Sequence, residues 1–277
     1  MTSRKGRPPA GGATTRRRER RAAERAARKR SGSTGPASSS RGRALSIPLI
    51  TGGAIVVGVV GLLLLVVATG GPGADDLEPV AMPEGGPPAE ALQVGRSLGD
   101  PGAPVQIELY EDPQCPACSL FTQSVEPLLV AGPISEGQAF LTYRDLVFIG
   151  DESLEAAAAM RVAEALDGKF WEFRDVLYHN QGEDENGGAF STDRLATMAE
   201  LVGLERDAFL AELDDPDYEA AVEAETAQAR EAGIGSTPTL VINGEVSAGV
   251  PDWDDLRARI ETAAAAVEET AATPEAD

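Results

Sequence analysis

The two cysteines are the feature that most restricts how this chain can fold. Cys115 and Cys118 are the only cysteines among 277 residues, and two residues separate them. The alternating stretch "VQIELY" at 105–110 predicts a strand directly before them, and the apolar spacing in "CSLFTQSVEPLLV" predicts a helix that begins at them. A pair at such a strand-to-helix junction has three candidate uses, namely a metal site, a structural disulfide or a redox centre.

Two of these uses fit the sequence poorly. A structural zinc ion needs four ligands, usually from Cys and His, and the chain offers only the distant His179 besides the pair. We therefore expect no metal. A disulfide that closes so short a loop removes little entropy from the unfolded chain, so a purely structural bridge is also disfavoured.

The redox use fits the predicted position of the pair. At a helix start the sulfur of Cys115 meets unpaired backbone N–H groups and the positive end of the helix dipole, and both favour the thiolate over the thiol. The thiolate is the attacking species in thiol-disulfide exchange. The sequence therefore predicts a redox-active Cys115–Cys118 pair.

Charge is divided very unevenly along the chain, whose formal net charge is -21. The first 43 residues carry 14 Lys and Arg and two acids, whereas the remainder is strongly acidic. Between them, residues 47–68 form a run of 22 residues without any charge. A helix of that length spans a bilayer core of about 30 Å, and the basic flank predicts that the N-terminus stays in the cytoplasm.

These shifts in composition divide the chain into five segments. They are a disordered, basic cytoplasmic tail at 1–44, a transmembrane helix at 45–68, a Gly- and Pro-rich linker at 69–90, a catalytic domain at 91–267 and a disordered acidic tail at 268–277. A signal peptide cleaved after Ala68 is the alternative to an anchor. The basic run at 16–21 is explained by membrane topology, so we expect no nucleic-acid partner.

Beyond the first strand, the pattern predicts more strands and a helical block. Strands are expected at 139–148, 239–242 and 245–248, with a turn at Asn243-Gly244 between the last two. Helices are expected throughout about 151–233 and again over 252–269. Pro127 should kink or end the helix that follows the cysteines.

Four stretches occur in the order typical of one family. They are "SLGDPGAPVQIELYEDPQCPAC", "LTYRDLVFIG", "KFWEFRDVLYHNQ" and "GIGSTPTLVING". Over about residues 91–265 the chain resembles the membrane-anchored, bacterial kind of DsbA-like thioredoxin-fold oxidoreductases. The resemblance implies an α/β, thioredoxin-like fold with a helical insertion, preceded by one transmembrane helix. It also implies a cis peptide bond between Thr237 and Pro238, and substrate binding by Ser236, Thr237 and Pro238.

The resemblance assigns roles to the cysteine motif as well. Cys115 would be the exposed, attacking sulfur, and Cys118 the more buried one, with Pro116 and Ala117 forming the active-site loop. DsbA carries a His where this chain has Ala117, so helix and backbone alone would have to stabilise the thiolate here.

A second departure from the family concerns proton transfer. Leu109 takes the place of the buried acid that DsbA and thioredoxins carry beneath the pair. Proton transfer at Cys118 is then left to water, to Glu111 or to Asp112, and the default interpretation of both acids is as solvated turn residues.

We therefore expect a membrane-anchored, extracytoplasmic thiol-disulfide oxidoreductase, most of all a monomeric dithiol oxidase. Its partners would be exported proteins that contain cysteine, together with a membrane reoxidase of the quinone-linked kind, and no bound cofactor is expected. Two alternatives stay open: an extracytoplasmic disulfide reductase, and a tethered thioredoxin-fold binding or chaperone module.

Overall fold

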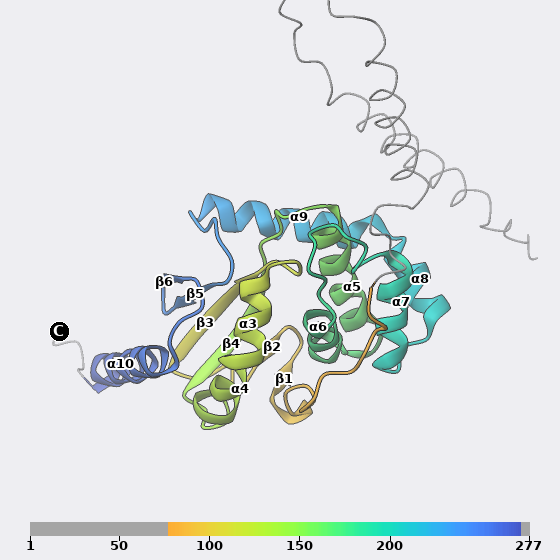
Figure 1. The fold of residues 1–277 in the computed structure, drawn as a ribbon. Coiled ribbons are helices and arrows are strands. Elements are labelled where there is room, and N and C mark those ends of the chain that lie inside the picture. The colour runs from red at the N-terminus through yellow and green to blue at the C-terminus, as the bar shows by residue number, and fades with distance from the viewer. Residues whose placement is uncertain (1–76, 273–277) are drawn as a thin grey trace, which may run out of the picture. The chain divides into compact units, whose positions relative to one another are not determined.

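The strand before the cysteines lies in the middle of a mixed sheet. In the computed structural model, which describes residues 77–272, β3 (Val105–Glu111) pairs in parallel with β4 (Ala139–Asp145) and antiparallel with β5 (Thr239–Ile242). The sheet has the order β1-β2-β4-β3-β5-β6, completed by β1 (Gln93–Val94), β2 (Ser97–Leu98) and β6 (Glu245–Ala248) (Figure 1). Because Val105, Ile107 and Leu109 alternate along β3 and are all buried, this strand anchors the core below the cysteine pair.

The segments predicted at 1–44 and 45–68 lie outside the described residues, as do the first part of the predicted linker and residues 273–277. Within the described range 77–272, no helix has the length and apolar character that crossing a bilayer requires. A short 3-10 helix, Glu90–Leu92, begins at the last residue of the predicted linker. The described part of this linker is also bonded to the domain, since Ala81 N–H donates to Asn180 Oδ1 at 2.8 Å and Arg194 Nη1 donates to Glu78 O at 2.9 Å.

The helix that follows the cysteines is broken where its sequence suggests a break. α3 (Pro116–Ser124) ends before Val125, and α4 (Glu126–Leu129) and a π-helical turn (Val130–Ile134) continue it. Pro127 thereby falls in the first turn of α4, where its missing N–H would have no helical partner anyway. Phe121 and Leu129 of these helices are buried in the same core cluster as Leu109 of β3.

A block of five helices connects β4 to β5. It comprises α5 (Asp151–Asp167), α6 (Phe170–His179), α7 (Thr192–Leu201), α8 (Arg206–Leu213) and α9 (Pro216–Glu231). The aromatic side chains of α6 form its interior, since Phe170, Trp171 and Phe173 are completely buried. Trp171 packs edge-on against Phe170 at 5.3 Å and donates its indole N–H to Gly95 O at 3.0 Å. These side chains therefore serve core packing.

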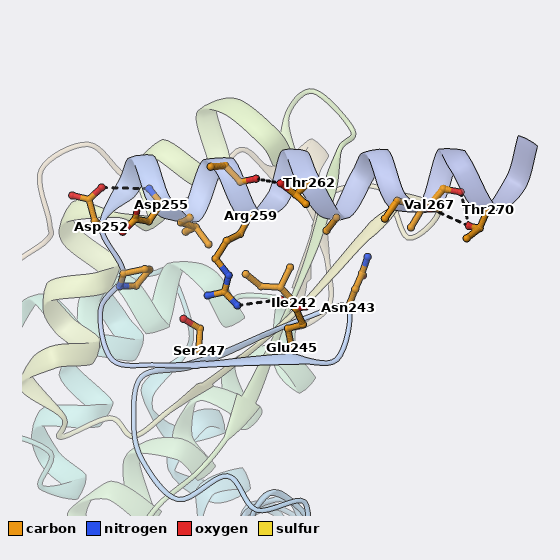
Figure 2. A pocket seen from close by; sticks show the side chains of 15 residues that line it. Ile242, Asn243, Glu245, Ser247, Asp252, Asp255, Arg259, Thr262, Val267 and Thr270 are labelled. Carbon is orange, nitrogen blue, oxygen red and sulfur yellow. Dashed lines mark hydrogen bonds and ion pairs between the residues drawn. The ribbon is translucent and has the colours of Figure 1, made fainter.

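The C-terminal helix and the β5–β6 hairpin enclose a surface groove. α10 (Trp253–Ala272) lies beside the hairpin, and Arg259 reaches toward Glu245 of β6 at 3.9 Å (Figure 2). Neither cysteine lines this groove. The helix continues to Ala272. Residues 268–272, which were predicted to belong to a disordered tail, are therefore helical.

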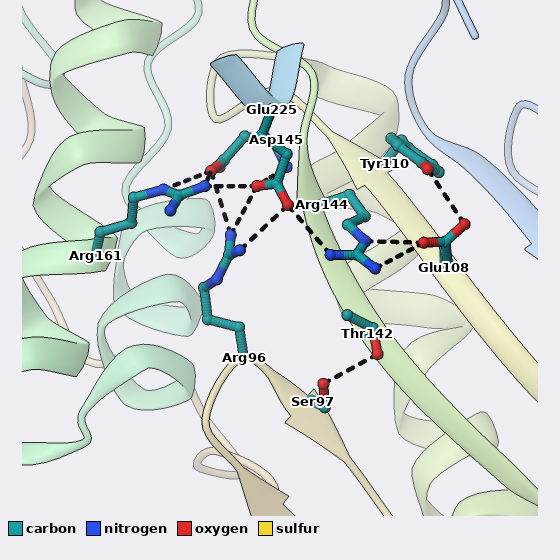
Figure 3. A network of polar contacts seen from close by, with 9 residues as sticks. All are labelled: Arg96, Ser97, Glu108, Tyr110, Thr142, Arg144, Asp145, Arg161 and Glu225. Atoms are coloured by element: carbon teal, nitrogen blue, oxygen red, sulfur yellow. Dashed lines mark hydrogen bonds and ion pairs between the residues drawn. The ribbon is translucent and has the colours of Figure 1, made fainter. Parts of the chain in front are cut away.

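Charged side chains hold the helical block to the sheet. Asp145 at the end of β4 is paired with Arg161 of α5 at 2.5 Å, and Arg161 also contacts Glu225 of α9 at 2.5 Å. Arg96, between β1 and β2, donates to Glu225 at 2.9 Å and Arg144 of β4 to Glu108 of β3 at 2.8 Å (Figure 3). The network fixes the helices against the two strands that lead toward the cysteines.

One strand boundary differs from the prediction. β4 ends at Asp145, three residues before the predicted end at Phe148. Leu146 still donates to Glu111 O of β3 at 3.0 Å, but the next N–H groups leave the strand ladder: Val147 donates to Thr226 Oγ1 at 3.0 Å and Phe148 to a carboxylate oxygen of Asp112 at 2.8 Å. The chain therefore turns toward the cysteine motif instead of extending β4.

Candidate active site

Cys115 is the N-cap residue of α3 and follows β3 through a tight turn. Its N–H donates to Asp112 O at 3.0 Å, and its carbonyl accepts the N–H groups of Cys118 at 3.1 Å and Ser119 at 3.2 Å. Cys115 is 6% exposed and Cys118 is completely buried, and both are free thiols. The predicted strand-to-helix junction is therefore present, and Cys115 is the more accessible of the two sulfurs.

The surroundings of Cys115 favour its thiolate. A hydrogen bond from the Cys118 thiol lowers the pKa of Cys115 to about 6, helped by the backbone N–H groups of Cys118 and Ala117, although burial acts in the opposite direction. The Thr237 hydroxyl, which has no hydrogen-bond partner among residues 77–272 while Cys115 is a thiol, lowers this pKa as a donor to the thiolate. The N-terminal end of α3 adds its dipole. The expectation that helix and backbone alone stabilise the thiolate is therefore incomplete, because the uncharged side chains of Cys118 and Thr237 contribute more than the backbone N–H groups.

The loop before β5 lies against Cys115. The Thr237–Pro238 peptide bond is cis, and the Cys115 thiol donates to Thr237 O at 3.4 Å. Ser236 is exposed, Thr237 is half-buried and Pro238 is buried. Together with the exposed Pro116, these residues form the rim around the accessible sulfur.

Cys118 is held in an apolar environment one helical turn away. Tyr178, Ile149 and Ala117 pack around the two sulfurs. Burial raises the pKa of the Cys118 thiol strongly, and the neighbouring Cys115 and Glu111 raise this pKa further. The two cysteines therefore differ as the sequence predicted: one sulfur favours the thiolate and the other retains its proton.

Glu111 is not the solvated turn residue that the default interpretation gave. It is the last residue of β3 and is completely buried, two residues after Leu109 on the same side of the strand. Its Oε2 accepts from Arg174 Nη2 at 2.6 Å, whereas its Oε1 has no hydrogen-bond partner among residues 77–272. Burial raises the pKa of this carboxyl to about 7, against the opposing effect of Arg174. A titrating acid thus lies beneath the pair although Leu109 replaces the expected one.

Asp112 is also buried, contrary to the same default interpretation, and its contacts indicate a positioning role. Oδ1 accepts from Ser153 Oγ at 2.6 Å and from Gln114 N–H at 2.9 Å, while Oδ2 accepts from the N–H groups of Phe148 at 2.8 Å and Ile149 at 3.1 Å. Four accepted hydrogen bonds stabilise a buried carboxylate. These hydrogen bonds also fix the turn in which the carbonyl oxygen of Asp112 accepts the N–H of Cys115.

Sequence reasoning missed Gln181 as well. Its Nε2 donates to Pro113 O at 2.7 Å and to Cys115 O at 3.1 Å, so it clamps the turn from the side of the helical block. Gln181 lies in the quoted "KFWEFRDVLYHNQ" stretch, just beyond the end of α6. Only the occurrence of that stretch in the family pattern could have drawn attention to it.

His179 ends α6 and has no place among the contacts of the cysteine pair. Across residues 77–272, no group of three or more His, Cys, Asp or Glu side chains is arranged to hold a metal ion. The site therefore consists of two thiols, the Thr237–Pro238 loop and the buried Glu111.

Known proteins with a similar sequence and fold include disulfide bond formation proteins. A family model described as Thioredoxin matches residues 92–262. Disulfide bond formation protein D of Bacillus subtilis is 26% identical over 166 residues, which cover 59% of this chain and 74% of the relative. The probable disulfide bond formation protein D of Bacillus cereus is 28% identical over 173 residues, covering 62% and 79%. The crystal structure of oxidised BdbD from Bacillus subtilis superposes with a TM-score of 0.58 at 25% identity, covering 65% of this chain and 97% of that one.

A sheet strand that leads into Cys-x-x-Cys at a helix start, beside a cis-proline loop, defines a thiol-disulfide oxidoreductase. The chain belongs to the thioredoxin family, because the family model covers more than half of it. Within that family it is a DsbA-like thiol-disulfide oxidoreductase.

Proposed function

We propose that this protein is a dithiol oxidase that introduces disulfide bonds into exported proteins. The observation that carries the proposal is the stabilised thiolate of Cys115, whose pKa is lowered to about 6. A thiolate exists only in the reduced enzyme, so its stabilisation favours the reduced form and makes the disulfide form a stronger oxidant. The relatives named disulfide bond formation protein D support the same direction.

The reaction transfers one disulfide from the enzyme to the substrate. A substrate thiolate attacks Cys115 Sγ, the bond to Cys118 breaks, and the Cys118 sulfur leaves with the electron pair and takes up a proton. A second substrate thiolate then attacks the substrate sulfur of the mixed disulfide and releases the Cys115 thiolate. The substrate is oxidised by two electrons, and the enzyme is left as a dithiol.

Each turnover therefore needs an oxidant that removes two electrons from the dithiol. A membrane reoxidase of the quinone-linked kind is the partner we propose, and the enzyme needs no cofactor of its own. Substrate would bind along the rim at Ser236, Thr237 and Pro238, where an extended peptide can add to the loop before β5. We propose that the enzyme acts as a monomer.

We further propose that the catalytic domain is extracytoplasmic and tethered by the apolar segment at 45–68. The basic flank and the acidic remainder support this topology. Protease added to cells whose wall has been removed but whose membrane is intact should digest the catalytic domain and spare an N-terminal tag. Protection of the domain would contradict this topology.

The reductase alternative is favoured by one observation, because Pro116 and Ala117 bring no charge to the thiolate. The reduction potential separates the two directions, because a disulfide-forming oxidase has a less negative potential than a disulfide reductase. The binding-module alternative is separated by Cys115→Ser, which should abolish disulfide formation in a reduced, unfolded substrate. A variant that keeps its full effect on the substrate would overturn the enzymatic proposal.

A further inference from the structure

Three carboxylates surround one buried arginine beneath the cysteine pair. Arg174 of α6 is completely buried, and its Nη2 contacts Glu111 of β3 at 2.6 Å and Glu126 of α4 at 2.8 Å. Its Nη1 lies 3.8 Å from Asp175. Because Glu111 and Glu126 share one nitrogen of Arg174, these two carboxylates lie side by side. We call these four residues the Arg174 cluster.

The charges of the Arg174 cluster do not balance when every group is ionised. One guanidinium, which stays protonated in proteins, would face three carboxylates and leave two uncompensated negative charges in a desolvated site. Burial and like-charge repulsion both oppose such a state. They raise the pKa of Glu111 and of Asp175 to about 7 each. The cluster therefore retains a proton near neutral pH.

One end of the Arg174 cluster adjoins the buried sulfur. The ring of Tyr178 lies 5.0 Å from the guanidinium of Arg174, and the same side chain packs against both Cys115 and Cys118. Glu111 is close enough for its charge to act on the Cys118 thiol. Its Oε1 carries no hydrogen bond within the described chain, so this oxygen is free to exchange a proton.

The other end of the Arg174 cluster opens to a cavity of about 560 Å³. Glu126, Asp175, Tyr178 and His179 line this cavity, together with residues 83, 84 and 86–89 of the segment before β1. Glu126 and Asp175 thus belong both to the buried cluster and to a wall that solvent can reach. The cluster, held together by Arg174, therefore lies between the surroundings of Cys118 and the cavity.

We propose that the Arg174 cluster is the proton route of Cys118, in which Glu111 exchanges the proton with the sulfur and Glu126 and Asp175 exchange it with water in the cavity. This proposal rests on the proposed function of the cysteine pair. It makes Glu126 and Asp175 positioning and relay residues, because neither touches the reacting sulfur atoms.

The proton and electron balance follows the direction of the reaction. When substrate attacks Cys115, the Cys118 sulfur leaves as a thiolate and accepts the proton of Glu111, and the cluster regains a proton through Asp175 or Glu126. During reoxidation the cluster first releases one proton to the cavity through Asp175 or Glu126. Cys118 then gives its proton to Glu111 while its electron pair forms the new S–S bond, and the oxidant removes two electrons.

Other titratable groups face the cluster from the surrounding elements. They are Tyr143 of β4, Tyr178 and Glu172 of α6 and Cys118 of α3. Burial raises the pKa of both tyrosines, so they stay neutral throughout the range that matters here. Inside the cluster the carboxylates and the Cys118 thiol are therefore the proton-exchanging groups, while His179 and Glu84 line the cavity outside it.

The first test is the pH dependence of the reaction of the full-length disulfide form with a small dithiol. Asp175→Asn should slow this reaction by about tenfold at neutral pH and flatten the wild-type profile near pH 7, and Asp175→Glu should restore both. Asp207→Asn is the control, since Asp207 is an exposed acid in the first turn of α8 and is not part of the cluster. Superimposable profiles for wild type and Asp175→Asn would overturn the route.

A second test needs no variant of the cluster and is therefore independent of its folding. The infrared difference spectrum between the disulfide and dithiol forms of the full-length wild type should contain a carboxylic-acid C=O band that responds to deuterium exchange. A spectrum without any such band between about pH 6 and about pH 8 would overturn the proposal. If the wild type fails to exchange disulfides with any dithiol, the proposed function itself fails, and the two failures are thereby distinguished.

Discussion

The sulfur of Cys115 lies 3.4 Å from the carbonyl oxygen of Thr237, across more than a hundred residues of sequence. The thiol thus meets the backbone of the loop at which we propose that substrate docks. A peptide that pairs with this loop would bring its own sulfur to Cys115 while Cys118 stays buried. The contact explains why Cys115 reacts with the substrate, whereas the buried Cys118 reacts only with Cys115.

Replacing the buried sulfur should trap substrates. In Cys118→Ala the thiolate of Cys115 can still attack a substrate disulfide, but no second enzyme thiol can release the product. Disulfide-linked adducts should therefore accumulate in cells and disappear on reduction, as seen on non-reducing gels. Cys115→Ser is the control and should give no adducts. Adducts that form equally with Cys115→Ser would show that Cys118 is the attacking sulfur.

Removing the Thr237 hydroxyl should weaken the thiolate. Hydrogen bonds to charged groups contribute about 1.5–3 kcal/mol, so Thr237→Val should raise the pKa of Cys115 by about one to two units from its value of about 6. The reduction potential should become more negative in parallel. Thiolate absorbance during a pH titration measures the pKa.

The exposed neighbour Ser236 offers the matched control for that experiment. Its hydroxyl lies 3.3 Å from that of Thr239 and is not among the main groups that stabilise the Cys115 thiolate. Ser236→Ala should leave the titration of Cys115 unchanged. Equal shifts in Ser236→Ala and Thr237→Val would mean that the loop acts through its conformation and not through the Thr237 hydroxyl.

The stability of the disulfide form should fall as pH rises toward and through neutrality. In that form neither cysteine titrates, and burial raises the pKa of Glu111 from 4.5 to about 7 in the folded state. Between these two values the folded state binds more protons than the unfolded state, so the free energy of unfolding decreases with pH. Glu111→Gln should reduce that slope by up to about 1.4 kcal/mol per pH unit, measured by urea denaturation. An unchanged slope would contradict a titrating Glu111.

Asp112 should be essential for the geometry of the cysteine turn. Asp112→Asn places an N–H₂ group among four donors, so we expect a loss of about 2–3 kcal/mol in the free energy of unfolding and a raised pKa of Cys115. Asp100→Asn is the control, because Asp100 accepts one hydrogen bond, from the exposed Gly102 N–H. Equal effects of the two substitutions would argue against a positioning role of Asp112.

Local patterns were sufficient to predict much of the fold. The alternation in β3, the Asn243-Gly244 turn and the apolar spacing of the helical block all lie where the sequence placed them, because each depends on neighbouring residues. The ends of β4 and α10 were misplaced. β4 ends early because distant Asp112 accepts the Phe148 N–H, and such a partner is invisible to a local pattern.

The burial of the two acids could not be predicted for the same reason. Glu111 and Asp112 adjoin Pro113 in a stretch that looks like a polar turn. Arg174, which pairs with Glu111, lies 63 positions later on α6, and Ser153, which binds Asp112, lies on α5. Only the assembled helical block brings these partners over the turn. The period of two along β3 did carry a usable signal, since it puts Glu111 on the side of Leu109.

The reduction potential of the full-length protein, equilibrated with glutathione, tests the central claim most directly. The stabilised thiolate of Cys115 predicts an oxidising value in the range of DsbA and protein disulfide isomerase, about -120 to -180 mV. A value near that of thioredoxin, about -270 mV, would contradict the oxidase proposal and place the enzyme among disulfide reductases.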